Sequence, residues 1–216
     1  MHHFHLPLER VELGYLSCEN KLKRIKMDTT HGNLNAKHQP ANEQLTWNHS
    51  EIISIKFDSS RTIEYVNEKL CELSEYEEYE LIGKPIDLLW HNEMPEVILK
   101  LIWDNVNAGT PTKAVVKAIS KTGKYFWVLV IIEESGKQNG AIAKHHLSRW
   151  MSIPEKIIRK LDVLYLKLIQ IERFKGIAVC EKFLLAYFEE NQITYPELMS
   201  RLCVSEKLDS IQLNAV

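Results

Sequence analysis

The sequence predicts an α+β fold, with a five-stranded antiparallel sheet, helices gathered on one face, and a C-terminal helical extension. Three observations predict this. Alternating or β-branched runs occupy residues 51–66 and 112–135, apolar residues at helical spacing lie between these runs, and helical patterns follow from residue 152. Strands and helices in this order are typical of an α+β domain. We therefore divide the chain into a largely irregular N-terminal extension at 1–46, a domain at 47–149 and a helical extension at 150–216.

Composition restricts the classes of function. A chain of 216 residues with 45% hydrophobic residues can fill the core of one ordinary domain. Its net charge of -2 gives no electrostatic case for a nucleic-acid groove or an anionic membrane surface. Its four cysteines contain no C-x-x-C pair, and no run of about 18 apolar residues occurs. We expect a reduced, cytoplasmic protein without a membrane span.

The first half of the domain begins with a hairpin. The runs at 51–58 and 62–66 are strand-like, and the polar stretch between them supplies a turn. Asn67 stands where it can cap the helix that follows, at 68–76. After Gly83 and Pro85, apolar residues from Val97 to Val106 mark one face of a helix of about four turns.

The second half predicts three more strands and then helices. The runs at 112–120 and 125–135 form a hairpin with apolar residues on both faces, so both faces should be covered. A last strand is expected at 141–148. Ser152, Pro154 and Glu155 have the pattern of a capping box at the start of a long helix, and Thr194 repeats it for a last helix. Apolar residues in the long helix follow an a/d rhythm that fits either packing within the chain or a dimer seam: Ile157, Leu161, Leu164, Leu168 and Ile171.

The domain resembles a PAS sensory domain, and it is most similar to the PAS domain of bacterial aerotaxis receptors. The resemblance covers about residues 47–148 and depends on the order of several short motifs: "YVN", "LIGKP", "MP" before a helix, Trp103, and "KTGKYFWV". It implies a five-stranded module that holds a ligand or cofactor between sheet and helices and passes changes to flanking helices. The occupant does not follow from the fold, since PAS domains bind different ligands or none.

The loop "WHNEMP" at 90–95 departs from the flavin-holding pattern of the aerotaxis type, which reads arginine, histidine, proline, aspartate, methionine, proline. His91 and the carboxylate of Glu93 are retained, but Trp90 replaces the arginine that would favour a flavin pyrophosphate. Ala118 and Ile119 stand where the family has asparagine and arginine, so the pocket should be more apolar than that of a flavin-binding relative. FAD is thus one candidate cofactor, on a partial match. Glu75 also stands where the family has a glycine.

On this resemblance, five residues surround the ligand pocket: Asn67, Trp90, His91, Glu93 and Trp103. Each has a plainer alternative. His91 can be an ordinary loop histidine, Glu93 can stabilise a helix N-terminus, and Asn67 can cap a helix. The two tryptophans can simply pack in the core.

We therefore predict a cytoplasmic PAS-type sensory protein that binds a small ligand or cofactor. It would transmit through the helix that follows Ser152 to a homodimer partner or to a separate signalling protein. The alternative is a ligand-free interaction module whose pocket is filled by Trp90 and Ile119. We expect no enzyme, because the chain has no P-loop, G-x-S-x-G, H-E-x-x-H or glycine-rich dinucleotide turn. A small enzyme that used Glu93 and His91 as its acid and base would need both side chains in an open pocket.

Overall fold

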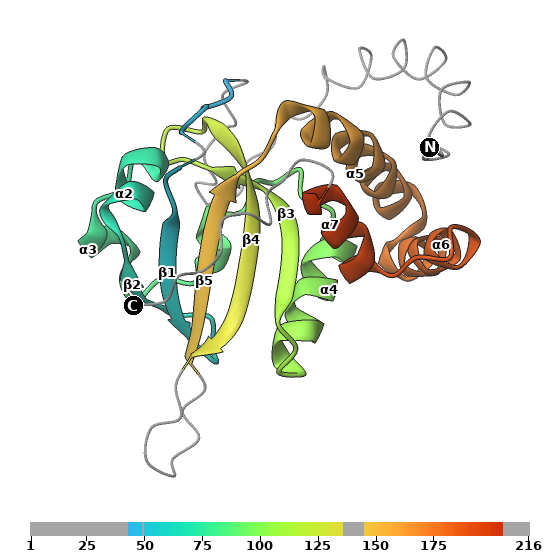
Figure 1. Cartoon of the computed structure of the whole chain (residues 1–216), viewed down its shortest axis with the longest axis horizontal. Helices are drawn as coiled ribbons and strands as arrows, with labels where there is room; N and C mark the ends of the chain where they lie inside the picture. The colour runs from blue at the N-terminus through green and yellow to red at the C-terminus, as the bar shows by residue number, and fades with distance from the viewer. Residues whose placement is uncertain (1–42, 49, 136–144, 205–216) are drawn as a thin grey trace, which may run out of the picture. The chain divides into compact units, whose positions relative to one another are not determined.

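A single antiparallel sheet forms the centre of the domain (Figure 1). The computed structural model describes residues 43–48, 50–135 and 145–204, so the predicted N-terminal extension lies almost entirely outside the described residues. The strand order is β2-β1-β5-β4-β3. The strands are β1 (Ile53–Asp58), β2 (Ile63–Val66), β3 (Thr112–Ile119), β4 (Tyr125–Ser135) and β5 (His145–Ser152). The α+β prediction and both predicted hairpins are confirmed.

The inner face of the sheet is covered by the first group of helices. These are α2 (Glu68–Ser74), α3 (Glu78–Leu81), the 3-10 helix η2 (Ile86–Leu89) and α4 (Glu96–Asn107). Alternate strand residues point to one face, so the register assigns one inner row to each strand. Buried members of these rows include Ile55 and Phe57 of β1, Trp150 of β5, Phe126 of β4 and Ala118 of β3.

The outer face is covered on its β3–β4 side by the C-terminal helices, which are α5 (Glu155–Lys175), α6 (Ile177–Glu190) and α7 (Tyr195–Val204) (Figure 1). The Tyr165 hydroxyl of α5 donates to the carbonyl of Val115 on β3 at 2.7 Å, and its ring lies 6.0 Å from that of Trp127. The a/d stripe of α5 is buried against its own chain: Ile157, Leu161, Leu164 and Leu168. The stripe is therefore accounted for by intrachain packing, without a dimer seam.

One of the two predicted capping boxes does not form. β5 continues through Ser152, and α5 starts only at Glu155, with Pro154 at the N-cap and no side-chain cap. The backbone of Ser152 stays in the sheet opposite Val128, and the residue therefore stands two positions before the N-cap. The second box is confirmed, because the backbone N–H of Thr194 donates to the Glu197 carboxylate at 2.7 Å.

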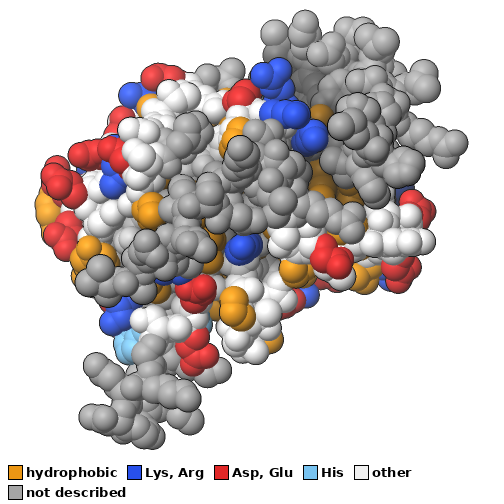
Figure 2. Space-filling model, in the orientation of Figure 1, with side chains coloured by type: hydrophobic (Ala, Val, Ile, Leu, Met, Phe, Trp, Pro, Cys, Tyr) orange, Lys and Arg blue, Asp and Glu red, His pale blue; other side chains and the backbone are white. Residues whose placement is uncertain are grey.

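Charged side chains of both signs are interspersed on the surface. Figure 2 shows acidic and basic side chains scattered over the face in view, without a large area of one sign. This agrees with the small net charge of -2. The surface seen there offers no extended single-sign field of the kind that attracts nucleic acid.

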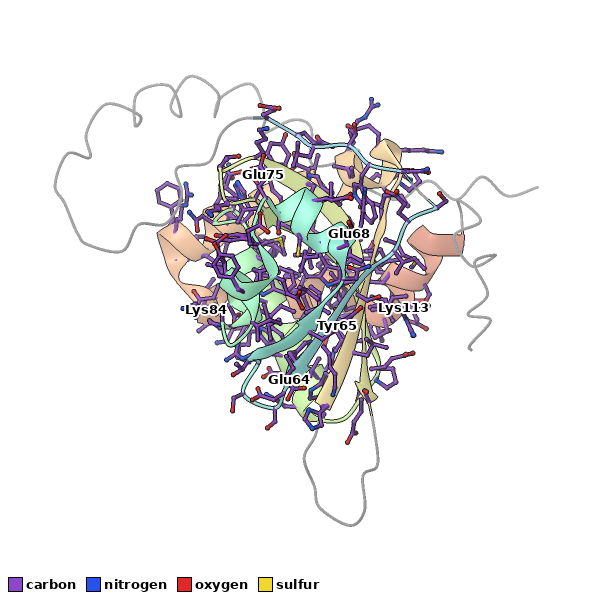
Figure 3. The ribbon with its side chains drawn as sticks, turned by 90° about the vertical axis from the view of Figure 1, so that its left-hand side faces the viewer. Glu64, Tyr65, Glu68, Glu75, Lys84 and Lys113 are labelled. Carbon is purple, nitrogen blue, oxygen red and sulfur yellow. The ribbon has the colours of Figure 1, made fainter. Side chains whose placement is uncertain are left out.

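Glu75 adopts the left-handed backbone conformation that the family's glycine would adopt freely. Its φ is 58°, at the C-terminal end of α2 (Figure 3). Its carboxylate accepts hydrogen bonds from the hydroxyls of Ser120 and Thr122, and it forms an ion pair with Lys124 at 3.2 Å. Burial opposes ionisation, but the hydrogen bonds from Thr122 and Ser120 prevail and lower the pKa of Glu75 to about 2. The carboxylate thus offsets the backbone strain at this position.

Two substitutions at Glu75 separate these effects. Glu75→Ala and Glu75→Gly both lose the carboxylate, so both should be less stable than the wild type. Only alanine retains the cost of positive φ, and Glu75→Ala should therefore be about 1 kcal/mol less stable than Glu75→Gly in urea unfolding at pH 7. Equal stability of the two variants would show that the backbone is not strained here.

Candidate functional site

The loop at 90–95 runs along the free edge of β3, and this edge divides its side chains between the two faces of the sheet. Trp90 forms a bridge with Ala118, and the backbone N–H of His91 donates to the carbonyl of Lys117 at 3.0 Å. Neighbouring residues in extended backbone point to opposite sides. Trp90 therefore lies on the inner face with Ala118, whereas His91 lies on the outer face with Lys117.

An aromatic layer fills the inner side. The Trp90 ring stacks on Trp150 of β5, with centroids 5.2 Å apart and planes 23° from parallel. Trp103 of α4 meets the edge of Phe57 at 5.9 Å, and Phe57 stacks on His146 at 5.2 Å. All five rings are buried. Such stacked and edge-to-face contacts are favourable beyond the area that they bury.

Two polar atoms in this layer have no partner. The Nε1 atoms of Trp90 and Trp103 are buried and make no hydrogen bond to any described residue. By contrast, Nε1 of Trp150 donates to the hydroxyl of Ser148 at 2.8 Å. Buried donors without acceptors are rare in folded proteins, so these two N–H groups could take the acceptor atoms of a small molecule.

A separate polar cluster forms on the outer side. His91 is 3% exposed, and its Nδ1 accepts a hydrogen bond from the backbone N–H of Glu93 at 3.0 Å. The Glu93 carboxylate accepts from Nζ of Lys117 at 2.7 Å, and that Nζ lies 4.2 Å from the centroid of the Tyr125 ring. Asp162 of α5 belongs to the same electrostatic neighbourhood, since Lys117 and Glu93 both affect its pKa. The cluster thus joins the loop, β3, β4 and α5.

The electrostatics of this cluster keep His91 neutral. Burial lowers the pKa of His91 to about 4, the positive charge of Lys117 acts in the same direction, and Glu93 opposes them. Because Nδ1 accepts a hydrogen bond, the ring proton belongs on Nε2, which has no partner among the described residues. Burial raises the pKa of Asp162, while Lys117 lowers it and Glu93 raises it.

Asn67 neither faces the inner layer nor caps α2. Its amide Nδ2 donates to the carbonyl of Ile52 at 2.8 Å, and its Oδ1 accepts from the N–H of Ser54 at 3.0 Å. The residue stands at the N-cap position of α2 but makes no side-chain cap. The predicted capping role is therefore wrong, because the side chain pairs with the backbone of Ile52 and Ser54 instead, whereas a role in cofactor binding stays a prediction.

The N-terminus of α4 is capped by a residue that the sequence did not indicate. The carboxylate of Glu172 on α5 accepts from the N–H of Val97 at 2.8 Å and from that of Glu96 at 3.1 Å. Glu93, the expected partner of this helix end, is instead paired with Lys117. The first N–H groups of a helix lack intrahelical acceptors, so a carboxylate here gains both hydrogen bonds and a favourable helix dipole.

The five predicted pocket residues therefore do not form one site. Only Trp90 and Trp103 reach the inner face, and Ile119, which was expected to help fill the pocket, pairs with Tyr125 and points outward. Trp90, which stands where the family has an arginine, stacks on Trp150. His91 and Glu93 face α5. This residue set does not fit FAD in the way the resemblance implied. Trp150, Phe57 and Glu172 were missed, because nothing in local spacing connects them to the loop.

Among the described residues no group of three or more His, Cys, Asp or Glu side chains is placed to hold a metal ion. None of the helices in the described part of the chain combines the length and apolar composition needed to cross a membrane.

The state of His91 predicts a pH dependence of stability. Its folded pKa of about 4 lies below the ordinary histidine value of 6.5, so between these values the unfolded chain binds a proton that the native chain does not. Stability should fall by about 2 kcal/mol from pH 7.5 to pH 5.0 through this group. Urea unfolding of His91→Gln should show a loss smaller by that amount. A full loss in His91→Gln would contradict the assignment.

Comparisons with known proteins agree with this architecture. Residues 50–144 match the family model described as PAS domain. A stretch of 71 residues is 30% identical to the aerotaxis receptor of Escherichia coli (strain K12). That match covers 33% of this chain but only 14% of the receptor.

Solved structures of light-oxygen-voltage (LOV) domains are similar at a lower level. A domain from a flavin-analogue study has 18% identity and a TM-score of 0.47, covering 57% of this chain and 90% of that one. The Aureochrome1 domain has 15% identity and a TM-score of 0.46, covering 50% and 87%. The domain from Erythrobacter litoralis EL346 has 11% identity and a TM-score of 0.44, covering 48% and 97%. These values say nothing about what this chain binds. Together, the five-stranded antiparallel sheet and the family match show that residues 50–144 are similar to a PAS domain, and part of this region is similar to an aerotaxis receptor.

Proposed function

We propose that this chain is a PAS-type signalling protein whose output is the packing of α5 and α6 on the PAS domain, read by a separate partner protein or a second copy. The observation that carries the proposal is the contact of the Glu172 carboxylate with the first backbone N–H groups of α4. This contact joins the inner helical layer to the C-terminal helices, 75 residues further along the chain. A shift of α4 would therefore change the contacts of the C-terminal helices, and a shift of those helices would change the contacts of α4.

The physical argument rests on what each side would lose. If α4 shifts, its first N–H groups lose their acceptor, and the Glu172 carboxylate loses two charge-assisted hydrogen bonds. A second ion pair, between Lys100 of α4 and Glu181 of α6 at 3.2 Å, crosses the same junction. It is half-exposed and contributes little energy, but it favours the same relative position. A two-state shift of α4 would thus bias the position of the α5–α6 pair.

The similarity to an aerotaxis receptor supports a sensory role for the PAS domain. This chain spans only 14% of that receptor, so aerotaxis itself is not part of the proposal. The inner layer favours signalling without FAD, since Trp90 and Trp150 stack near the place of the missing arginine and Asn67 is bound to backbone. The proposed role is that of a contact-making module and not of an enzyme.

Replacing the cap tests the proposal. Glu172→Ala should destabilise the protein by about 1 kcal/mol, as loss of a helix cap does. It should also raise amide hydrogen exchange at Glu96 and Val97, and throughout α5 and α6, because the junction loses its acceptor. The pairing strands β1 and β5 should keep their protection.

Glu189→Ala is the matched control, since Glu189 is an exposed carboxylate on α6 away from the α4 junction. It should leave exchange in α4 and α5 unchanged. If Glu172→Ala altered only the first turn of α4 and left α5 and α6 as protected as in the wild type, the junction would not transmit, and the proposal would be wrong.

A small-ligand sensor is the second candidate, and the unpartnered Nε1 atoms of Trp90 and Trp103 favour it. A compact molecule with acceptor atoms between sheet and α4 would satisfy both donors. Such a ligand would act on α4 directly, so the same junction would carry its signal. The two candidates differ only in the input.

Absorbance and mass spectrometry of the natively purified protein distinguish the inputs. The leading proposal predicts a colourless sample without a flavin absorption band in the visible region. Denaturation should release no small molecule in stoichiometric amount from the protein. A stoichiometric non-flavin compound, lost from a Trp90→Phe, Trp103→Phe double variant that still folds, would favour the ligand sensor. A yellow sample that releases FAD would contradict our interpretation of the aromatic layer.

A further inference from the structure

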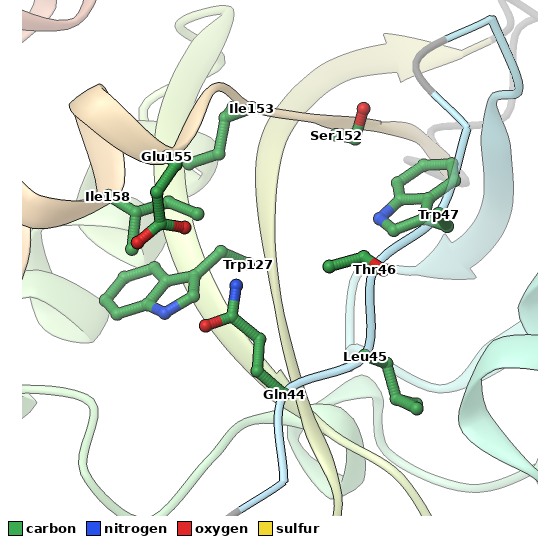
Figure 4. A pocket seen from close by; sticks show the side chains of 9 residues that line it. All are labelled: Gln44, Leu45, Thr46, Trp47, Trp127, Ser152, Ile153, Glu155 and Ile158. Atoms are coloured by element: carbon green, nitrogen blue, oxygen red, sulfur yellow. The ribbon is translucent and has the colours of Figure 1, made fainter.

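A pocket of about 160 Å³ lies on the outer side of the sheet, away from the aromatic inner layer. It is formed by residues 44–47, by Trp127 of β4, by the end of β5 and by the first turn of α5 (Figure 4). The segment that closes it is held by backbone hydrogen bonds, from the N–H of Leu45 to the carbonyl of Tyr125 at 2.7 Å and from the N–H of Tyr125 to Glu43 at 2.9 Å. Hydrogen bonds to the backbone of Tyr125 therefore hold this wall of the pocket in place.

Two indoles and a carboxylate define the chemistry of this pocket. Figure 4 shows Trp127 beneath the carboxylate of Glu155 on one side, and Trp47 on the other, with Gln44 between them. Aromatic faces attract cations through their ring quadrupoles, and tryptophan does so most strongly. A carboxylate beside such faces adds a full opposite charge. The combination selects for positive charge.

The negative charge of the Glu155 carboxylate is only weakly neutralised by a neighbouring cation. Its ion pair with a described residue joins it to Nε of Arg159 at 3.6 Å, and the Arg159 side chain is 77% exposed. An exposed pair at one helical turn contributes very little. A cation that enters the pocket can therefore pair with the Glu155 carboxylate without breaking a strong ion pair.

The pocket also has a second indole and a polar group in its lining. Trp47 stands on the side opposite Trp127 (Figure 4). The amide of Gln44 can donate or accept a hydrogen bond.

We propose that this pocket binds a small organic ammonium compound. The ammonium group lies beside the Trp127 indole and the Glu155 carboxylate, with Trp47 on the opposite side. The volume restricts the ligand to a compact molecule, since an engineered cavity of about 150 Å³ just holds benzene. The site is independent of the α4 junction and of any occupant of the inner layer.

Choline is a suitable probe, and its neutral isostere 3,3-dimethylbutan-1-ol is the matched control compound. Isothermal titration of the full chain at low salt should show one choline bound with a Kd of about 1 mM or tighter, which corresponds to about -4 kcal/mol. The isostere has the same shape and hydroxyl but no charge, and it should bind at least tenfold more weakly. Choline affinity should fall with added salt, because the charges are partly exposed to solvent.

Variants locate the site. Glu155→Gln and Trp47→Leu should each weaken choline binding at least tenfold, whereas Glu190→Gln, an exposed carboxylate at the end of α6, should leave it unchanged. Circular dichroism confirms that each variant is folded before titration. No choline binding up to about 10 mM, an order of magnitude above the expected Kd, would overturn the proposal. Equal binding of the neutral isostere, or unchanged affinity in Glu155→Gln, would overturn it as well.

Discussion

The pairing of residues 90 and 91 with the edge of β3 decides where the other groups of this domain act. By opposing Ala118 and donating to the Lys117 carbonyl, the loop closes an edge that would otherwise expose unpaired backbone. The same pairing fixes the alternation of side chains. Trp90 must enter the inner layer and His91 must face α5. A slip of one residue would exchange them, placing an imidazole among stacked indoles and an indole beside Lys117.

Small and large residues complement each other at this edge. Trp90 can lie across the inner face because Ala118, to which it pairs, has a minimal side chain and is fully buried. The family's asparagine at this position would bring a polar amide beneath the indole. Trp90 and Ala118 both depart from the family pattern, and one physical reason explains both. The small side chain of Ala118 leaves the space that the large ring of Trp90 fills. The stack on Trp150 completes an apolar surface on this part of the inner face.

The fold was predictable because its signals are periodic. The hairpins, α4 and the stripe of α5 repeat at two or 3.6 residues, and each repeat is visible in a short window. The site was less predictable, since a single residue in a loop has no period to show which face it takes. The resemblance of the loop to a flavin-holding pattern groups His91 and Glu93 with Trp90, although the edge pairing separates them. Glu172 caps a helix 75 residues earlier, and no local pattern can announce a cap at that separation.

α5 connects the features that the proposals use. Glu155 stands in its first turn at the outer pocket, and Glu172 stands in its last turn at the N-terminus of α4. These two carboxylates are separated by 17 residues of continuous helix, or about 26 Å at 1.5 Å per residue. Tyr165 fastens the middle of the helix to β3, so the two ends cannot move independently of the sheet. α5 therefore carries a wall of the outer pocket at its first turn and the cap of α4 at its last turn.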